Sequence, residues 1–100
     1  MLNIEKKLEG NVLEVALEGR LDTTTAPDLE ALLKESMEGI SELVLNFEKL
    51  EYISSAGLRV LLFAQKTMSK TGSMKVIHVS NDVKEIFEVT GFLDILTVED

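Results

Sequence analysis

The sequence predicts a single α/β domain with a mixed, partly parallel β-sheet and helices packed on it. Two segments of period-two hydrophobicity joined by a tight turn open the chain, and short apolar segments then alternate with segments of helical periodicity. One proline and six well-spaced glycines separate these segments. The expected order is β-β-α-β-α-β-α-(β), because strands that alternate with helices form parallel pairs. We expect one domain over residues 1–100.

The opening hairpin makes the predicted sheet mixed. Leucine and isoleucine recur at even spacing over residues 2–8, which predicts a first strand. Residues 9–11, Glu-Gly-Asn, are typical of a tight turn. Apolar and polar side chains then alternate over residues 13–17, as expected of a strand with one solvent-facing side. Residues 19–22, Gly-Arg-Leu-Asp, are predicted to leave the strand.

The first helix is predicted to begin after Thr25. The Thr25 side chain can cap the helix, Pro27 suits its first turn, and Asp28 lies near the positive end of the helix dipole. Leucines follow at helical spacing as far as Met37, and Gly39 can end the helix.

Later elements follow from the same reasoning. The apolar run 43–45 predicts a strand buried on both faces. A second helix is expected over about 58–70 and a mostly apolar strand over 74–79. A third helix, capped by Asn81 and closed by Gly91, precedes a last short strand over 95–98.

Composition and charge exclude several classes of function. The chain has no cysteine, and its 18 acidic residues against 10 basic ones give a formal net charge of -8. No cluster of three basic residues occurs, so we expect neither nucleic acid nor a membrane as a partner. A basic protein suits the acidic surface better. Without a signal-peptide pattern or a long apolar run, a cytoplasmic location is expected.

The segment Ser54-Ser55-Ala56-Gly57-Leu58 stands at a strand-to-helix junction. A serine in this place ordinarily caps the helix, with its hydroxyl accepting from amides near Gly57 and Leu58. The same helix N-terminus, with its free amides and partial positive charge, also tolerates a phosphate on the serine. Both interpretations remain open from the residues alone.

An enzyme interpretation has less support. Residues 55–57 match the second half of a G-x-S-x-G nucleophile elbow, but Ile53 replaces its first glycine. The only histidine, His78, is expected half-buried in a strand rather than acting as a base. Asp22, Glu48 and Glu51 have no spacing typical of acid–base catalysis, and no phosphate-binding or metal-binding motif occurs. We therefore expect no catalysis, cofactor or metal, and a serine hydrolase using Ser55 and His78 is the enzyme-class alternative.

The second helix carries more apolar side chains than one narrow stripe can hold. Arg59, Val60 and Phe63 cannot all share the inner face with Leu58 and Leu61. Either the helix buries a wide stripe against a sheet and a neighbouring helix, or part of it forms a docking face for a partner.

Five short segments together resemble the STAS domain, and within it the small stand-alone bacterial anti-sigma factor antagonists. They have the order and spacing of that family, and the resemblance covers nearly all of the chain. The segments are Gly19–Thr23, Leu43–Phe47, Tyr52–Leu58, Gly72 and Val89–Phe92.

This resemblance implies a partner-switching mechanism. Unphosphorylated antagonists of this family bind an anti-sigma factor that is also a serine kinase, the kinase phosphorylates a serine at the start of the second helix, and a phosphatase resets the protein. The family pattern Asp-Ser-(Ser/Thr/Ala)-Gly-Leu places the acceptor at Ser55, with Ser54 at the aspartate position and as the substitute acceptor. Asn46 stands where the family often has an aspartate.

The resemblance also implies which residues bind the partner. They are Asp22, Ser54, Ser55, Ala56, Gly57, Leu58 and Arg59. Asp22 has a purely local alternative, because aspartates routinely bond the amides of their own turn. The departures at Ser54 and Asn46 favour the alternative function, a STAS scaffold or ligand-sensing module that is not phosphorylated.

Overall fold

A five-stranded mixed sheet with helices packed on it organises the chain, as expected. The computed structural model describes residues 2–99, and the strand order is β1-β2-β3-β4-β5. The hairpin strands β1 and β2 are antiparallel, and every other neighbouring pair is parallel. The elements are β1 (Leu2–Glu9), β2 (Val12–Leu21), α1 (Ala26–Ser36), β3 (Glu42–Ile53), α2 (Ser55–Thr71), β4 (Ser73–Ile77), α3 (Asn81–Thr90), the 3-10 turn η1 (Phe92–Asp94) and β5 (Val98–Glu99).

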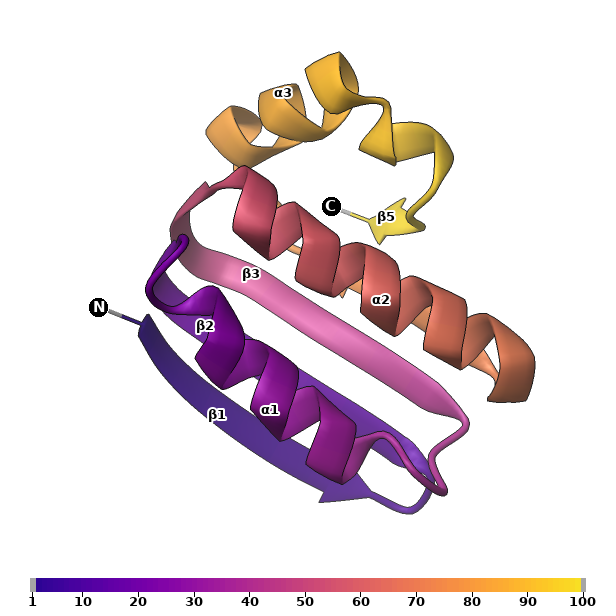
Figure 1. Cartoon of the computed structure of the whole chain (residues 1–100). Helices are drawn as coiled ribbons and strands as arrows, with labels where there is room; N and C mark the ends of the chain where they lie inside the picture. Colours follow the sequence, from indigo (N-terminus) through magenta and orange to yellow (C-terminus); the bar gives the residue numbers. More distant parts are fainter. Residues whose placement is uncertain (1, 100) are drawn as a thin grey trace.

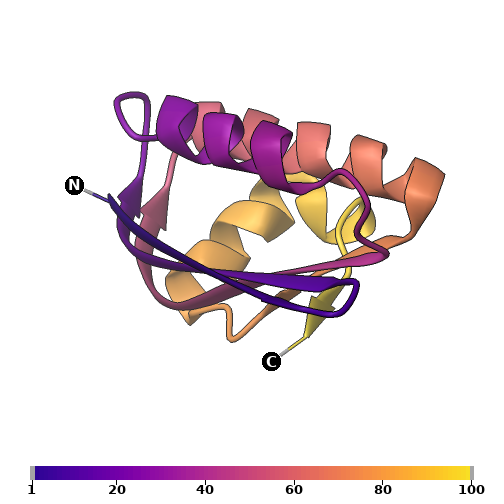
Figure 2. The ribbon, with the colours of Figure 1, turned by 90° about the horizontal axis from the view of Figure 1, so that it is seen from below.

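The helices α1 and α2 lie side by side over one face of the sheet (Figures 1 and 2). The core lies between these two layers. The parallel register sets Leu13 beside Leu43 and Val15 beside Leu45, and all four side chains are buried. Period-two alternation in the strands and a 3.6-residue period in the helices direct these apolar sets toward each other. Buried helix residues that complete the core include Leu29, Leu33, Leu61, Ala64 and Met68.

The helix α3 lies apart from this pair, beyond one end of α2 (Figure 1). Its buried Phe87 packs against Phe47 of β3, with the ring centroids 6.3 Å apart and the rings tilted by 41°. This contact joins the C-terminal third of the chain to the central strand. Gly91 ends α3 as predicted, with φ +81.

The strand β2 runs further than the sequence indicated. Residues 19–22 were expected to leave the sheet, but β2 continues to Leu21. Two register shifts between β2 and β3, one between Ala16 and Glu18 and one between Gly19 and Arg20, explain the difference. Gly19 has φ +112, a conformation open to glycine, and the pairing then resumes as far as Leu21 and Ile53. The strands β2 and β3 therefore both extend to the start of α2.

Two predicted caps are wrong in detail. Thr25 precedes α1, but its hydroxyl donates to the Arg20 carbonyl at 2.8 Å and makes no cap hydrogen bond. The third helix is capped by Ser80, whose hydroxyl accepts from the Val83 amide, while Asn81 is already helical. Serine and asparagine are equally good cap residues by type, so only the backbone conformation decides between Ser80 and Asn81.

Candidate functional site

The ends of β2 and β3 meet the start of α2 at one corner of the molecule. The Ser54 amide donates to the Leu21 carbonyl at 2.9 Å, which extends the parallel ladder by one residue beyond Ile53. The Leu58 amide then donates to the Ser54 carbonyl at 2.9 Å as the first bond of α2. The turn that holds Asp22 is thereby brought beside the Ser54–Ser55 segment, as expected.

Ser54 is the N-cap residue by position but not by bonding. Its backbone is extended, with φ -98 and ψ 177, yet its side chain makes no cap hydrogen bond. The Ser54 Oγ atom is buried and has no hydrogen-bond partner. The prediction that a serine hydroxyl caps this helix is therefore wrong. The backbone amides at the start of α2 therefore receive no hydrogen bond from the Ser54 side chain.

Three consecutive amides at the start of α2 are unpaired. Within residues 2–99, the N–H groups of Ser55, Ala56 and Gly57 make no hydrogen bond. Free amides and aligned peptide dipoles place a partial positive charge at the beginning of this 17-residue helix. Ser55 is the first helical residue and is exposed. The geometry suits an anion carried by the Ser55 side chain.

Asp22 organises the turn next to this helix start. Its Oδ1 atom accepts from the Thr24 amide at 3.0 Å, the Thr24 hydroxyl at 2.8 Å and the Thr25 amide at 3.2 Å. The Thr24 hydroxyl, followed by the backbone amides, lowers the pKa of the Asp22 carboxyl below its ordinary value. The local role foreseen for Asp22 is thus present. Since these bonds all use Oδ1, the second oxygen is left for another donor.

Gly57 and Leu58 lie beneath the surface, whereas Arg59 is exposed and Ala56 half-buried. A Cβ atom added to Gly57 would lie 2.8 Å from both Ile53 Cγ1 and Leu21 Cγ. Only a glycine lets the first turn of α2 approach the ends of both strands this closely. Gly57 therefore sets the position of the helix start.

A cation–π contact beside the site could not be predicted from the sequence. The Arg20 guanidinium lies 4.4 Å from the centroid of the Tyr52 ring. The register places these residues opposite each other on β2 and β3, just after the second shift. Such a contact holds an exposed arginine in place near the corner. Knowledge of the register would have been needed to predict it.

The hydrolase alternative fails on distance. His78 was expected inside a strand, but β4 ends at Ile77, and His78 is exposed with φ +58. Ile77 pairs with Asn46, whereas Ser55 follows the end of β3 at Ile53. Seven residues of strand separate these levels, roughly 20 Å at 3.3 Å per residue. His78 is far outside the hydrogen-bonding reach that a general base needs.

The wide apolar stripe of α2 is covered within the chain itself. Val60 is buried and Phe63 is partly buried, with Lys34 Nζ of α1 lying 5.7 Å from the centroid of the Phe63 ring. A neighbouring helix therefore explains the additional apolar residues of α2, and no docking face is required for them.

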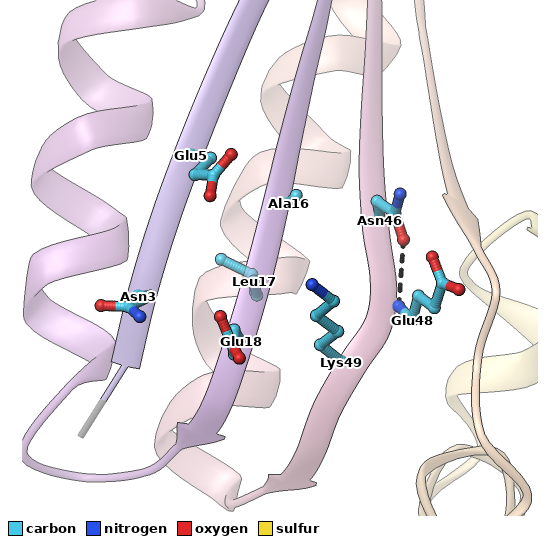
Figure 3. A pocket seen from close by; sticks show the side chains of 8 residues that line it. All are labelled: Asn3, Glu5, Ala16, Leu17, Glu18, Asn46, Glu48 and Lys49. Atoms are coloured by element: carbon cyan, nitrogen blue, oxygen red, sulfur yellow. Dashed lines mark hydrogen bonds between the residues drawn. The ribbon is translucent and has the colours of Figure 1, made fainter.

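The opposite face of the sheet holds a shallow hollow of about 180 Å³ (Figure 3). Asn46 lies at its rim, where its Oδ1 accepts from the Glu48 amide at 3.0 Å and its Nδ2 donates to Glu14 at 3.3 Å. These bonds give Asn46 a structural role where β3 shifts register. No group of three or more metal-ligating side chains occurs among residues 2–99. In the same range, no helix is long and apolar enough to cross a membrane.

Comparisons with known proteins agree with this fold. The family model described as STAS domain matches residues 3–100. BtrV of Bordetella bronchiseptica, named as an anti-sigma factor antagonist, is 37% identical over 94 residues, which are 92% of this chain and 80% of that protein. An anti-sigma factor antagonist from Mycobacterium paratuberculosis superposes with a TM-score of 0.89 at 20% identity, covering 99% of this chain and 86% of that one. The Bacillus cell fate determinant SpoIIAA in its phosphorylated form superposes with a TM-score of 0.75 at 16% identity, covering 96% and 90%.

Proposed function

This chain belongs to the STAS domain family, and we propose that it is an anti-sigma factor antagonist that binds an anti-sigma factor serine kinase and is released when Ser55 is phosphorylated. The names of its relatives support the antagonist role. An antagonist acts by binding another protein and needs no catalytic residue. The observation that carries the switch is the exposed Ser55 at a helix start with three open amides.

Burial favours Ser55 over Ser54 as the acceptor. A kinase must bring the hydroxyl of its substrate to the γ-phosphate of ATP in line, which requires an accessible side chain. The Ser54 Oγ atom is buried, and its phosphorylation would require the junction between β3 and α2 to open. Ser55 is exposed where it stands.

The helix start accommodates the product. A phosphate adds about -1.5 to -2 charges, which the free amides and the helix dipole stabilise. Arg59 lies four residues after Ser55 on the same face of α2 and is exposed. The fold therefore tolerates the phosphate, while a partner docked on this corner meets new charge and bulk. A phosphatase that removes the phosphate is the second partner, and the exchange takes place in the cytoplasm.

The partner contacts we propose divide by exposure. Ser55 and Arg59 are exposed, and Asp22, Ser54 and Ala56 are half-buried, so these residues form the contact surface. Gly57 and Leu58 act from beneath it, because both are buried and hold α2 against β2 and β3.

Phosphorylation by the cognate kinase tests the proposal. The wild-type protein and its Ser54→Ala variant should each gain one phosphate with ATP, seen by mass spectrometry, whereas Ser55→Ala should gain none. Binding to the kinase should persist in Ser55→Ala and weaken in Ser55→Asp. Thermal unfolding of each variant separates lost binding from lost folding.

Three outcomes would decide against the switch. Phosphate found on Ser54 would refute the burial argument, and equal binding by Ser55→Asp and Ser55→Ala would remove the role of charge. Binding without any phosphate incorporation would favour the unphosphorylated scaffold instead.

A further inference from the structure

The outer edge of β1 is open. Among residues 2–99, β1 lies at an end of the strand order and pairs only with β2 (Figure 1). It is eight residues long, and Leu8 near its end is 62% exposed. A long edge strand presents unpaired backbone groups that can accept another strand.

The turn decides which backbone groups are open. The two-residue loop at Gly10 and Asn11 closes on the pair Glu9 and Val12, so odd-numbered residues of β1 direct their N–H and C=O groups to β2. The Asn11 carbonyl accepts from the Ser41 amide at 2.8 Å on the β3 side, which agrees with Val12 facing β1. Even-numbered residues of β1 therefore direct their backbone groups outward.

We propose that this edge pairs antiparallel with β1 of a second copy of the chain, about a two-fold axis at Lys6. Across such an edge, the hydrogen-bonded pairs are formed by even-numbered residues of both strands, and odd-numbered residues lie opposite each other without hydrogen bonds. Centring the pairing on Lys6 places Ile4 opposite Leu8 and Glu5 opposite Lys7, each twice by symmetry. The sheets of the two copies then become continuous, and Leu8 gains an apolar neighbour.

The charges select this register. Moving the axis to Glu5 would oppose Glu5 to its own copy, and moving it to Lys7 would oppose Glu5 to Glu9. Like charges directly opposite each other are destabilising. The Lys6-centred register opposes Lys6 to its own copy once, on the axis, but it is the one of these three registers that also makes two Glu–Lys pairs.

Lysines on an edge strand often prevent pairing, so their positions matter here. The Lys6 Nζ atom donates to Ser36 Oγ of α1 at 3.3 Å, which holds this ammonium group over its own helix. Lys7 contacts Glu9 at 3.0 Å and would face Glu5 of the second copy. Two strands bury less surface than a standard interface, so the dimer is weak and forms at high protein concentration.

Analytical ultracentrifugation tests the pairing. At about 1 mM protein and moderate salt, the weight-average mass should rise toward twice the 11.1 kDa of one chain. Glu5→Lys and Lys7→Glu should each weaken the association tenfold or more, because each creates two like-charge contacts. The double variant Glu5→Lys/Lys7→Glu should restore it. Glu38→Lys and Lys66→Glu, which change the same charges away from β1, are the matched controls.

Hydrogen exchange of the backbone amides tests the proposed register between the two β1 strands directly. On association, the amides of Ile4, Lys6 and Leu8 should exchange more slowly, by about twofold when half of the chains are dimeric, while the amides of Glu5 and Lys7 change little. A chain that stays monomeric at this concentration, or a dimer that the single reversals leave intact, would overturn the proposal. Thermal unfolding confirms that each variant is folded before its mass is compared.

Discussion

Gly57 packs closely against the ends of β2 and β3 where they meet α2. We expect Gly57→Ala to destabilise the protein, although alanine ordinarily favours a helix interior by about 1 kcal/mol over glycine. The added methyl group would overlap Ile53 and Leu21, both buried, and overpacking of this kind costs about 1–3 kcal/mol. Urea unfolding measures the difference.

The control for this substitution is Ser69→Ala on the exposed side of α2. It should change the free energy of unfolding by no more than about 0.5 kcal/mol. If Gly57→Ala proved as stable as the wild-type protein, the close approach of α2 to the strand ends would be disproved.

Asp22 should make stability depend on pH. Hydrogen bonds, first that of the Thr24 hydroxyl, lower its pKa in the folded state below the ordinary value of 3.8. The unfolded chain then takes up this proton first as the pH falls, so the contribution of Asp22 is present above 3.8 and is lost below it. Asp22→Asn should therefore lose less stability than the wild-type protein between neutral and acid pH.

Urea unfolding at several pH values checks this expectation. Asp94→Asn, which removes an exposed carboxylate from η1, is the matched control. An Asp22→Asn profile parallel to that of the wild-type protein would contradict the role assigned to the turn.

At the scale of elements, two serines at helix starts should behave differently. Ser80→Ala removes a hydroxyl that accepts from the Val83 amide at 3.3 Å, and should cost about 0.5–2 kcal/mol. Ser54→Ala removes a buried hydroxyl without a partner, so it should be neutral or stabilising by up to about 1 kcal/mol. The midpoints of thermal unfolding rank the two variants, and the reverse order would show that Ser54 caps α2 after all.

The order of elements was predictable because each segment carries its own periodicity. Residues 13–17 alternate as a strand, Gly91 ends α3, and a helix follows the strand at the Ser54–Leu58 segment as expected, although it begins at Ser55 rather than at about Leu58. The absence of a hydrogen-bond partner for the Ser54 hydroxyl and the stacking of Arg20 on Tyr52 were not predictable. Both depend on how β2 and β3 align after their register shifts, and these residues are about 30 positions apart in sequence.

The same reasoning explains why the exposure of Ser55 was easier to predict than the packing around it. The exposure of a serine at a helix N-terminus can be predicted from the local sequence. A helix that directly follows a strand begins where that strand ends, beyond the last paired residues of the sheet. Burial of Gly57 depends instead on the side chains of Leu21 and Ile53, which come from two other elements. Tertiary contacts of this kind leave no trace in a single sequence.

At the scale of the whole molecule, the net charge of -8 is the dominant electrostatic feature. Among residues 2–99, the ion pairs Lys7–Glu9, Lys34–Glu30, Lys75–Glu42 and Lys75–Glu99 lie at or near the surface and contribute little each. Repulsion among the excess carboxylates opposes the compact state, and salt screens it.

We therefore expect added salt to stabilise this protein. Raising NaCl from about 10 mM to about 150 mM shortens the Debye length from about 30 Å to about 8 Å, which is well below the 32 Å longest extent of the fold. If screening is worth on the order of 1 kcal/mol, the Tm rises by about 4–8 °C. Scanning calorimetry measures this rise, and potassium chloride at the same ionic strength should reproduce it. A Tm that falls with salt would mean that the surface ion pairs outweigh the net repulsion.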